Sequence, residues 1–198
     1  NAGTWSSSRR VTGDGFELVW ATNQLGYFLT TELLKPALLK ASRARVVSVA
    51  SELARDLDLT DVSFSRRRYR GISAYAQSKQ ANRMWTRALA RRLAGTNVTA
   101  NSLHPGSVAT GLPGKGGGVL AMLAGLAVSF VGRSPKEGAD TALWLATSDE
   151  VAGRSGLFYV DRKQRFCRFT NEAEEEKLWE LCGSMTAAKP PEPWFAPA

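Results

Sequence analysis

The stretch Ser73-Ala74-Tyr75-Ala76-Gln77-Ser78-Lys79-Gln80-Ala81-Asn82 decides how the rest of the chain is organised. It opens a helical pattern in which Tyr75 and Lys79 stand four residues apart and therefore share one face. A free phenol, with a pKa of about 10, exchanges protons poorly near neutrality. A cation one turn away favours the phenolate, so Tyr75 is a candidate general acid or base. Because the same spacing occurs by chance on solvated helices, the neighbouring elements must decide between the two interpretations.

Short buried strands flank this helix in the sequence. Residues 45–51 form a β-branched run without polar alternation that ends in Ser51, residues 98–103 repeat the pattern, and residues 157–160 form a third run. Such runs are typical of parallel strands covered on both faces. We expect the three strands to be parallel neighbours with helices on both faces. Ser51 would then lie at the carboxyl end of its strand, where open α/β sheets bind their ligands.

Hydrophobic spacing and capping residues predict the other helices. Apolar side chains recur at three- and four-residue intervals from Phe16 to Leu34, which predicts a long, largely buried helix with Pro36 near its end. Asn171 caps a final amphipathic helix. Another helix, running to about residue 146, begins with an N-cap, a proline and a capping-box glutamate: Ser134, Pro135 and Glu137.

The composition is that of an ordinary globular domain, with 43% hydrophobic and 22% charged residues in a chain of 198. A net charge of +8 suits nucleic acid, an anionic membrane or a phosphate-bearing cofactor, and we favour the last. The basic run of residues 66–70 has one aromatic residue and no supporting motif, so we interpret it as a solvated loop and expect no nucleic-acid partner. Cys167 and Cys182 form no disulfide framework, which indicates a reducing, cytoplasmic setting.

Three further features of the sequence do not indicate a catalytic or phosphate-binding site. His104 is the only histidine in the sequence and has no partner at a triad spacing, so we interpret it as a structural histidine with satisfied hydrogen bonds, and we expect no metal site. The glycine-rich residues 111–118 lack the Ser or Thr of a Walker A loop and are interpreted as a hinge. The apolar residues 119–131 are too few to span a bilayer and fit a core helix, a lid or a membrane-facing patch.

Motifs along the whole chain follow a recognisable order: Asn1-Ala2-Gly3, Asn23 within Asn-Gln-Leu-Gly-Tyr-Phe, Ser51, Tyr75 with Lys79, and Pro105-Gly106 with Thr110. Over residues 1 to about 182 this order resembles the short-chain dehydrogenase/reductases. The resemblance implies the carboxyl-terminal part of a Rossmann-like, doubly wound parallel sheet in three α/β/α layers. We expect residues 1–185 to be the catalytic portion of one such domain, and the proline-rich residues 186–198 to be a disordered tail.

The resemblance also implies a role for each of these residues. Ser51 would orient the substrate, and Tyr75 would act as general acid or base. Lys79 would bind the ribose of the cofactor and lower the pKa of Tyr75, while Asn23 would hold a water that links Lys79 to solvent. The remaining cofactor contacts would come from two turns: Asn1, Ala2 and Gly3, and Pro105, Gly106 and Thr110.

The implied activity is NAD(P)-dependent interconversion of an alcohol and a carbonyl, with NADP favoured over NAD by the resemblance. Residues 12–17, Thr-Gly-Asp-Gly-Phe-Glu, and the His-Pro-Gly of residues 104–106 narrow it to the branch that resembles retinol dehydrogenases and the WW-domain-containing oxidoreductase. With the apolar residues 119–131, that branch implies a small lipophilic, retinol- or lipid-like alcohol, aldehyde or ketone. Peripheral membrane contact and a homodimer are compatible with it.

The glycine-rich turn with which this family binds the pyrophosphate is not in the sequence. Its place would be upstream of Asn1. We therefore expect residues 1–198 alone to lack dehydrogenase activity. The alternative interpretation is a catalytically inactive, truncated reductase that acts as a binding module.

Overall fold

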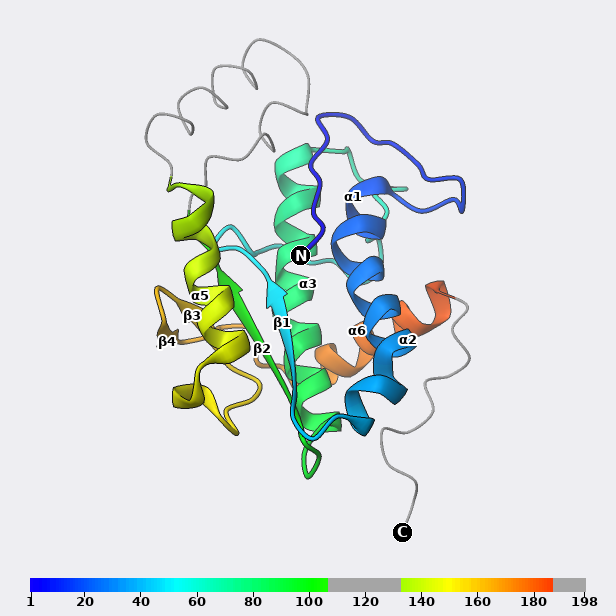
Figure 1. Cartoon of the computed structure of the whole chain (residues 1–198). Helices are drawn as coiled ribbons and strands as arrows, with labels where there is room; N and C mark the ends of the chain where they lie inside the picture. The colour runs from blue at the N-terminus through cyan, green and yellow to red at the C-terminus, as the bar shows by residue number, and fades with distance from the viewer. Residues whose placement is uncertain (107–132, 187–198) are drawn as a thin grey trace.

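A computed structural model describes residues 1–106 and 133–186 as helices packed on both sides of a β-sheet (Figure 1). The helical elements are α1 (Leu18–Trp20), the π-helical turn η1 (Ala21–Leu25), α2 (Gly26–Lys40), α3 (Gly71–Arg92), α5 (Pro135–Thr147), the 3₁₀ turn η3 (Asp149–Val151) and α6 (Glu172–Met185). The strands are β1 (Ala44–Val49), β2 (Val98–His104), β3 (Phe158–Val160) and β4 (Lys163–Arg165). The predicted hinge, the apolar run after it, Thr110 and the tail beyond Thr186 lie outside the described residues.

The sheet has the strand order β1-β2-β3-β4, and its first three strands are parallel. Ala44 of β1 lies opposite Val98 of β2, and Ser102 of β2 lies opposite Phe158 of β3. The prediction of three parallel neighbours is therefore confirmed. Because parallel strands end at the same edge of a sheet, the segments that follow β1 and β2 meet there.

Helices α3 and α5 cover opposite faces of β1 and β2 (Figure 1). Side chains along β2 alternate between the two faces. Val98 and Ala100 join a core cluster with Trp85 of α3, whereas Leu103 packs against Leu145 of α5. The predicted three-layer α/β/α arrangement is confirmed. Across the described ranges, none of the helices has the length and apolar character needed to traverse a bilayer.

Strand β4 departs from the prediction, which has no strand after residue 161. It runs antiparallel to β3 across a two-residue turn of Asp161 and Arg162, whose φ angles are 52° and 57°. Positive φ at both positions suits the hairpin turn that matches strand twist. Ion pairs with Arg133 and Asp140 hold the turn in place. All three β4 residues are exposed, so no hydrophobic pattern marks the strand in the sequence.

The predicted helix over residues 16–35 is a continuous helical segment from Leu18 to Lys40 that contains η1. It begins where the buried carboxylate of Glu17 accepts hydrogen bonds from the main-chain N–H groups of Val19 and Trp20. These bonds satisfy donors that the first turn of a helix leaves unpaired. The segment continues through Pro36.

The burial predicted for this helix is wrong near its end, because Leu33 is 72% and Leu34 is 51% exposed. Phe28 is fully buried, and Leu33 and Leu34 follow it by five and six residues, which places both more than about 100° away from it around the helix. The apolar spacing in the sequence therefore extends beyond the face that α2 buries.

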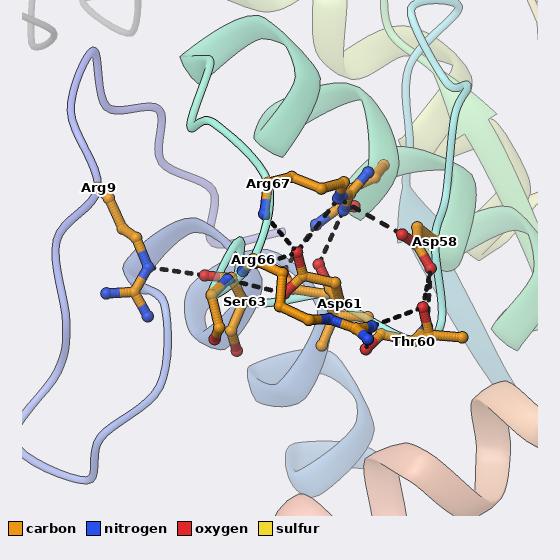
Figure 2. A network of polar contacts seen from close by, with 10 residues as sticks. Arg9, Asp58, Thr60, Asp61, Ser63, Arg66 and Arg67 are labelled. Carbon is orange, nitrogen blue, oxygen red and sulfur yellow. Dashed lines mark hydrogen bonds and ion pairs between the residues drawn. The ribbon is translucent and has the colours of Figure 1, made fainter.

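The insertion between β1 and α3 folds around the carboxylate of Asp61 (Figure 2). Asp61 is 6% exposed and accepts hydrogen bonds from the main-chain N–H groups of residues 65, 66 and 67. The guanidinium of Arg67 donates to Gln77 of α3 at 3.1 Å, and Arg9 donates to the Ser63 carbonyl at 2.8 Å. The interpretation of residues 66–70 as a solvated loop is thus wrong for Arg67, which anchors the insertion to α3.

Ion pairs fasten helix α6 to the carboxyl-terminal end of α3. Glu175 is fully buried, and its carboxylate pairs with Arg87 at 2.7 Å and with Arg91. Glu176 pairs with Arg91 and Arg92. A buried carboxylate of this kind matters mainly because its removal leaves its cationic partners uncompensated.

We expect Glu175→Gln to lower the free energy of unfolding by about 2 kcal/mol, a value below that for a fully buried pair because both arginines are partly exposed. Urea denaturation would measure the change. Glu180→Gln, at an exposed position of the same helix, is the matched control and should change stability by less than about 0.5 kcal/mol. Equal losses in the two variants would contradict a stabilising role for the buried pair.

Candidate active site

Tyr75 and Lys79 lie one turn apart on α3, beside the end of β1. The Lys79 ammonium donates a hydrogen bond to the carbonyl oxygen of Val49, the last residue of β1, at 2.8 Å, and it lies 5.7 Å from the centre of the Tyr75 ring. Gly71 lets α3 begin where it does, because a Cβ there would come within 2.2 Å of the Ser6 carbonyl oxygen. The structure thus brings the two predicted residues together.

Ser51 lies just beyond β1 and is 5% exposed. Its side chain is hydrogen-bonded to the Tyr75 hydroxyl, and its Oγ accepts a hydrogen bond from the main-chain N–H of Leu53 at 3.2 Å. The two side chains are therefore neighbours at the carboxyl edge of the sheet, as the position of Ser51 after its strand predicts.

The pKa of Tyr75 is raised above its ordinary value, which corrects the expectation that Lys79 lowers it. Burial of the phenol is the larger cause and raises the pKa, while the hydrogen bond with Ser51 lowers it. The Lys79 ammonium is directed to the Val49 carbonyl and is not among the groups that shift this pKa. Tyr75 is therefore a protonated phenol near neutrality and is ready to act as a donor.

Lys79 is 3% exposed, and its ammonium is held by polar groups and aromatic rings. Besides the Val49 carbonyl it donates to the side-chain oxygen of Asn82 at 3.2 Å, and it lies 5.4 Å from the centre of the Tyr27 ring. Burial lowers the pKa of Lys79 to about 8, because removal from water disfavours the charged form. The side chain is still mostly protonated at neutral pH.

Asn23 is fully buried in η1, and its polar groups are engaged by the protein. Its side chain exchanges hydrogen bonds with the main chain of Thr4 at 2.8 and 3.1 Å and donates to the Ser78 hydroxyl at 3.0 Å. The main-chain carbonyl oxygen of Asn23 accepts a hydrogen bond from the Asn82 side chain at 2.7 Å. Because the Asn82 side chain also accepts a hydrogen bond from Lys79, it links the lysine to η1 directly. Asn82, three residues after Lys79 on the same helical face, was missing from the predicted site.

The segment of Asn1, Ala2 and Gly3 passes next to Lys79. A Cβ at Gly3 would lie 3.8 Å from the Asn23 side-chain oxygen and 4.0 Å from the Lys79 ammonium. Asn1 and Ala2 are exposed. The predicted cofactor turn therefore lies beside the predicted ribose-binding lysine.

Pro105 and Gly106 follow β2 at the same edge of the sheet. Gly106 has a φ of 82°, and a Cβ there would come within 2.9 Å of the Arg133 side chain. Glycine is the residue that tolerates both the left-handed backbone and the close approach. Arg133 in turn pairs with Asp161 of the hairpin turn. Thr110, the other predicted residue of this turn, lies outside the described residues.

His104 ends β2, and its hydrogen bonds are not satisfied as expected. Its Nδ1 is buried and has no hydrogen-bond partner among residues 1–106 and 133–186, and its Nε2 lies 3.7 Å from the Glu52 carboxylate. Burial is the main cause that lowers the pKa of His104, so the ring is neutral at pH 7. In the described part of the chain, no three His, Cys, Asp or Glu side chains are grouped as a metal site.

The chain matches the sequence model of a known family and is similar to characterised proteins. The family model, described as short chain dehydrogenase, matches residues 1–116. Human retinol dehydrogenase 14 is 39% identical over 192 residues, which cover 93% of this chain and 56% of the relative. The WW domain-containing oxidoreductase of Gallus gallus is 34% identical over 192 residues, which cover 91% of this chain and 46% of the relative. The chain spans about half the length of these relatives.

Solved structures share the fold. The crystal structure of an uncharacterised protein from Mycobacterium paratuberculosis has a TM-score of 0.70 and 30% identity, and the match covers 97% of this chain and 67% of that one. A protein from Beutenbergia cavernae, described as an NAD(P)-dependent gluconate 5-dehydrogenase with NADP bound at low occupancy, has a TM-score of 0.56 and 27% identity. This second match covers 80% of the chain and 61% of that protein.

The buried Lys79 predicts how stability depends on pH. A lysine in an unfolded chain ionises near pH 10.4, whereas burial lowers the pKa of Lys79 to about 8. Between these values the unfolded chain binds more protons, so stability rises with pH through this window. Relative to Lys79→Met, we expect the wild type to gain up to about 3 kcal/mol between pH 8 and 10.5.

Urea denaturation at a series of pH values would measure this difference, since groups common to both proteins cancel. Lys163→Met, which removes an exposed lysine of β4, controls for the loss of a positive charge. Parallel stability curves for wild type and Lys79→Met would show that the ammonium is not buried as described.

Proposed function

The chain belongs to the short-chain dehydrogenase family, and from that premise we propose that it carries the proton-transfer residues of an NAD(P)-dependent oxidoreductase that interconverts an alcohol and a carbonyl. The observation that carries the proposal is the grouping of Tyr75, the Ser51 side chain and the buried ammonium of Lys79 at the end of β1. Two hydroxyl donors that meet at one point can both reach a single carbonyl oxygen placed there. The buried Lys79 ammonium beside them supplies a positive charge.

The residues next to Lys79 fit a cofactor ribose. Two hydrogen bonds of the ammonium are made within the described part of the chain, to Val49 and Asn82. An ammonium has three donors, so one remains for a ribose hydroxyl. Gly3 keeps the adjoining space free of a side chain, since a Cβ there would approach the ammonium to 4.0 Å. Pro105 and Gly106, at the end of the neighbouring strand, would border the nicotinamide.

A bound nicotinamide cofactor would supply the hydride for reduction or accept it for oxidation. In the reducing direction Ser51 donates a hydrogen bond to the substrate carbonyl oxygen, and Tyr75 donates its proton to that oxygen. Lys79 would hold the ribose of the cofactor beside Tyr75. In the oxidising direction the Tyr75 phenolate takes the proton of the alcohol. With its pKa raised, Tyr75 would be in the protonated form that reduction requires near neutral pH.

The finer parts of the proposal are the cofactor and the substrate class. NADP is supported by the Beutenbergia cavernae structure and by the net charge of +8, which suits an additional phosphate. A lipophilic, retinol-like alcohol or aldehyde is supported by the names of the retinol dehydrogenase relatives. The cofactor and the substrate class are proposed for the whole protein, because the match with human retinol dehydrogenase 14 covers 56% of that relative.

The proposal predicts that Tyr75→Phe abolishes most turnover in the complete protein. The substitution keeps the aromatic ring and removes the proton that is transferred, so kcat should fall by about two to four orders of magnitude while cofactor affinity stays within threefold. NADPH consumption with all-trans-retinal and with a straight-chain aldehyde would measure kcat, and NADPH fluorescence would measure binding.

Tyr159→Phe is the matched control. Among the described residues the Tyr159 hydroxyl has no hydrogen-bond partner, and its ring packs on the α5 side of the sheet, so its loss should leave turnover unchanged. Turnover of Tyr75→Phe within threefold of the wild type would reject Tyr75 as the proton donor. A complete protein that binds NADPH without turnover of either substrate would favour the binding module instead.

A further inference from the structure

Arg83 is the third member of a row of polar side chains on α3. Tyr75, Lys79 and Arg83 follow one another at intervals of four residues, so all three lie on one face of the helix. Arg83 is 6% exposed, and its Nη2 donates a hydrogen bond to the main-chain carbonyl oxygen of Ser51 at 2.5 Å. The helix therefore reaches Ser51 twice, with Tyr75 at the side chain and Arg83 at the main chain.

The guanidinium of Arg83 is also fixed in orientation. Its central carbon lies 3.6 Å from the centre of the Phe158 ring, at the distance of a stacked cation–π contact. Phe158 belongs to β3 and is itself buried, and Phe169 lies on the same group at 5.7 Å. The planar fork is thus held between the end of β1 and the body of β3, and its hydrogen bond to Ser51 has little freedom to move.

Burying the charged guanidinium of Arg83 between α3 and β3 costs free energy. Removal from water lowers the pKa of Arg83, and in the part of the chain that the structure describes its buried Nε has no hydrogen-bond partner. Within the described ranges Arg83 makes no ion pair closer than 4.0 Å. The charged or titratable groups around it are Glu52, Cys167, Arg168 and His104. A methionine or leucine would fill the same volume without burying a charge, so the polar contact with Ser51 is what distinguishes arginine here.

We propose that Arg83 is a positioning residue for Ser51, which it holds by the main chain so that the serine hydroxyl meets the hydroxyl of Tyr75. The inference rests on the proposed function, because Ser51 is taken there as the residue that orients the substrate. Arg83 itself touches neither hydroxyl and acts through the Ser51 peptide alone. When this bond is lost, the peptide after β1 gains freedom, and the two hydroxyls converge for less of the time.

The test compares Arg83→Met with Arg83→Lys in the complete protein. Methionine retains the length and apolar stem but donates no hydrogen bond, whereas lysine can still donate to the Ser51 carbonyl. Small misplacements of reacting groups have large effects on rate. We expect Arg83→Met to lower kcat by about 10- to 100-fold, with the KM for NADPH changed less than threefold, and Arg83→Lys to recover most of the loss.

A second measurement needs no turnover. Ultraviolet difference titration of each protein against its Tyr75→Phe counterpart isolates the ionisation of Tyr75. Because the hydrogen bond with Ser51 lowers the pKa of Tyr75, this pKa should be higher in Arg83→Met than in the wild type, and higher in Ser51→Ala for the same reason. Arg83→Lys should titrate like the wild type.

Arg87→Gln is the matched control, one turn further along α3. Arg87 pairs with Glu175 of α6 instead of Ser51, so its loss should reduce stability and leave kcat and the Tyr75 titration unchanged. The inference is overturned if Arg83→Met retains kcat and the wild-type titration, or if the methionine and lysine variants lose both equally. A wild type without turnover would reject the proposed function only, and the titrations would then decide the role of Arg83.

Discussion

The structure depends on the placement of one charged amine inside the protein. With 3% of its surface exposed, Lys79 needs bonded partners, and they come from β1 through the Val49 carbonyl and from α3 through Asn82. Asn82 also donates to Asn23 and Gln24 of η1, so the same ammonium connects three elements that are far apart in the sequence. The edge of the sheet, the helix and the π-helical turn are thereby locked in register around the candidate active site.

The row of phenol, ammonium and guanidinium on α3 explains how one helix can organise the end of a strand. Its three members reach two residues at the end of β1: Lys79 bonds the Val49 carbonyl, whereas Tyr75 and Arg83 contact the side chain and the carbonyl of Ser51. The position of the serine hydroxyl is therefore defined relative to the tyrosine by several bonds, and a change at any of them is felt at the others.

Local sequence signals were sufficient for the features that local physics determines. The apolar runs at residues 45–51 and 98–103 mark β1 and β2, the box of Ser134 and Glu137 caps α5 as predicted, and the four-residue spacing places Tyr75 beside Lys79. Features that depend on partners distant in the chain were not predictable in this way. Strand β4 has no hydrophobic pattern, Asn82 and Arg83 look like ordinary helix-surface residues in the sequence, and the raised pKa of Tyr75 follows from burial that only the packed structure reveals.

The π-helical turn at residues 21–25 holds one residue more than the same length of α-helix would. Removing one residue there would let the segment relax to a regular α-helix, and the parts before and after the turn would keep nearly the same rotation relative to each other. Tyr27 and Phe28 would therefore keep their places in the core. The loss would fall on the polar contacts of the turn itself, those of Asn23 with Thr4 and Ser78, so such a deletion would disturb the candidate active site more than the core.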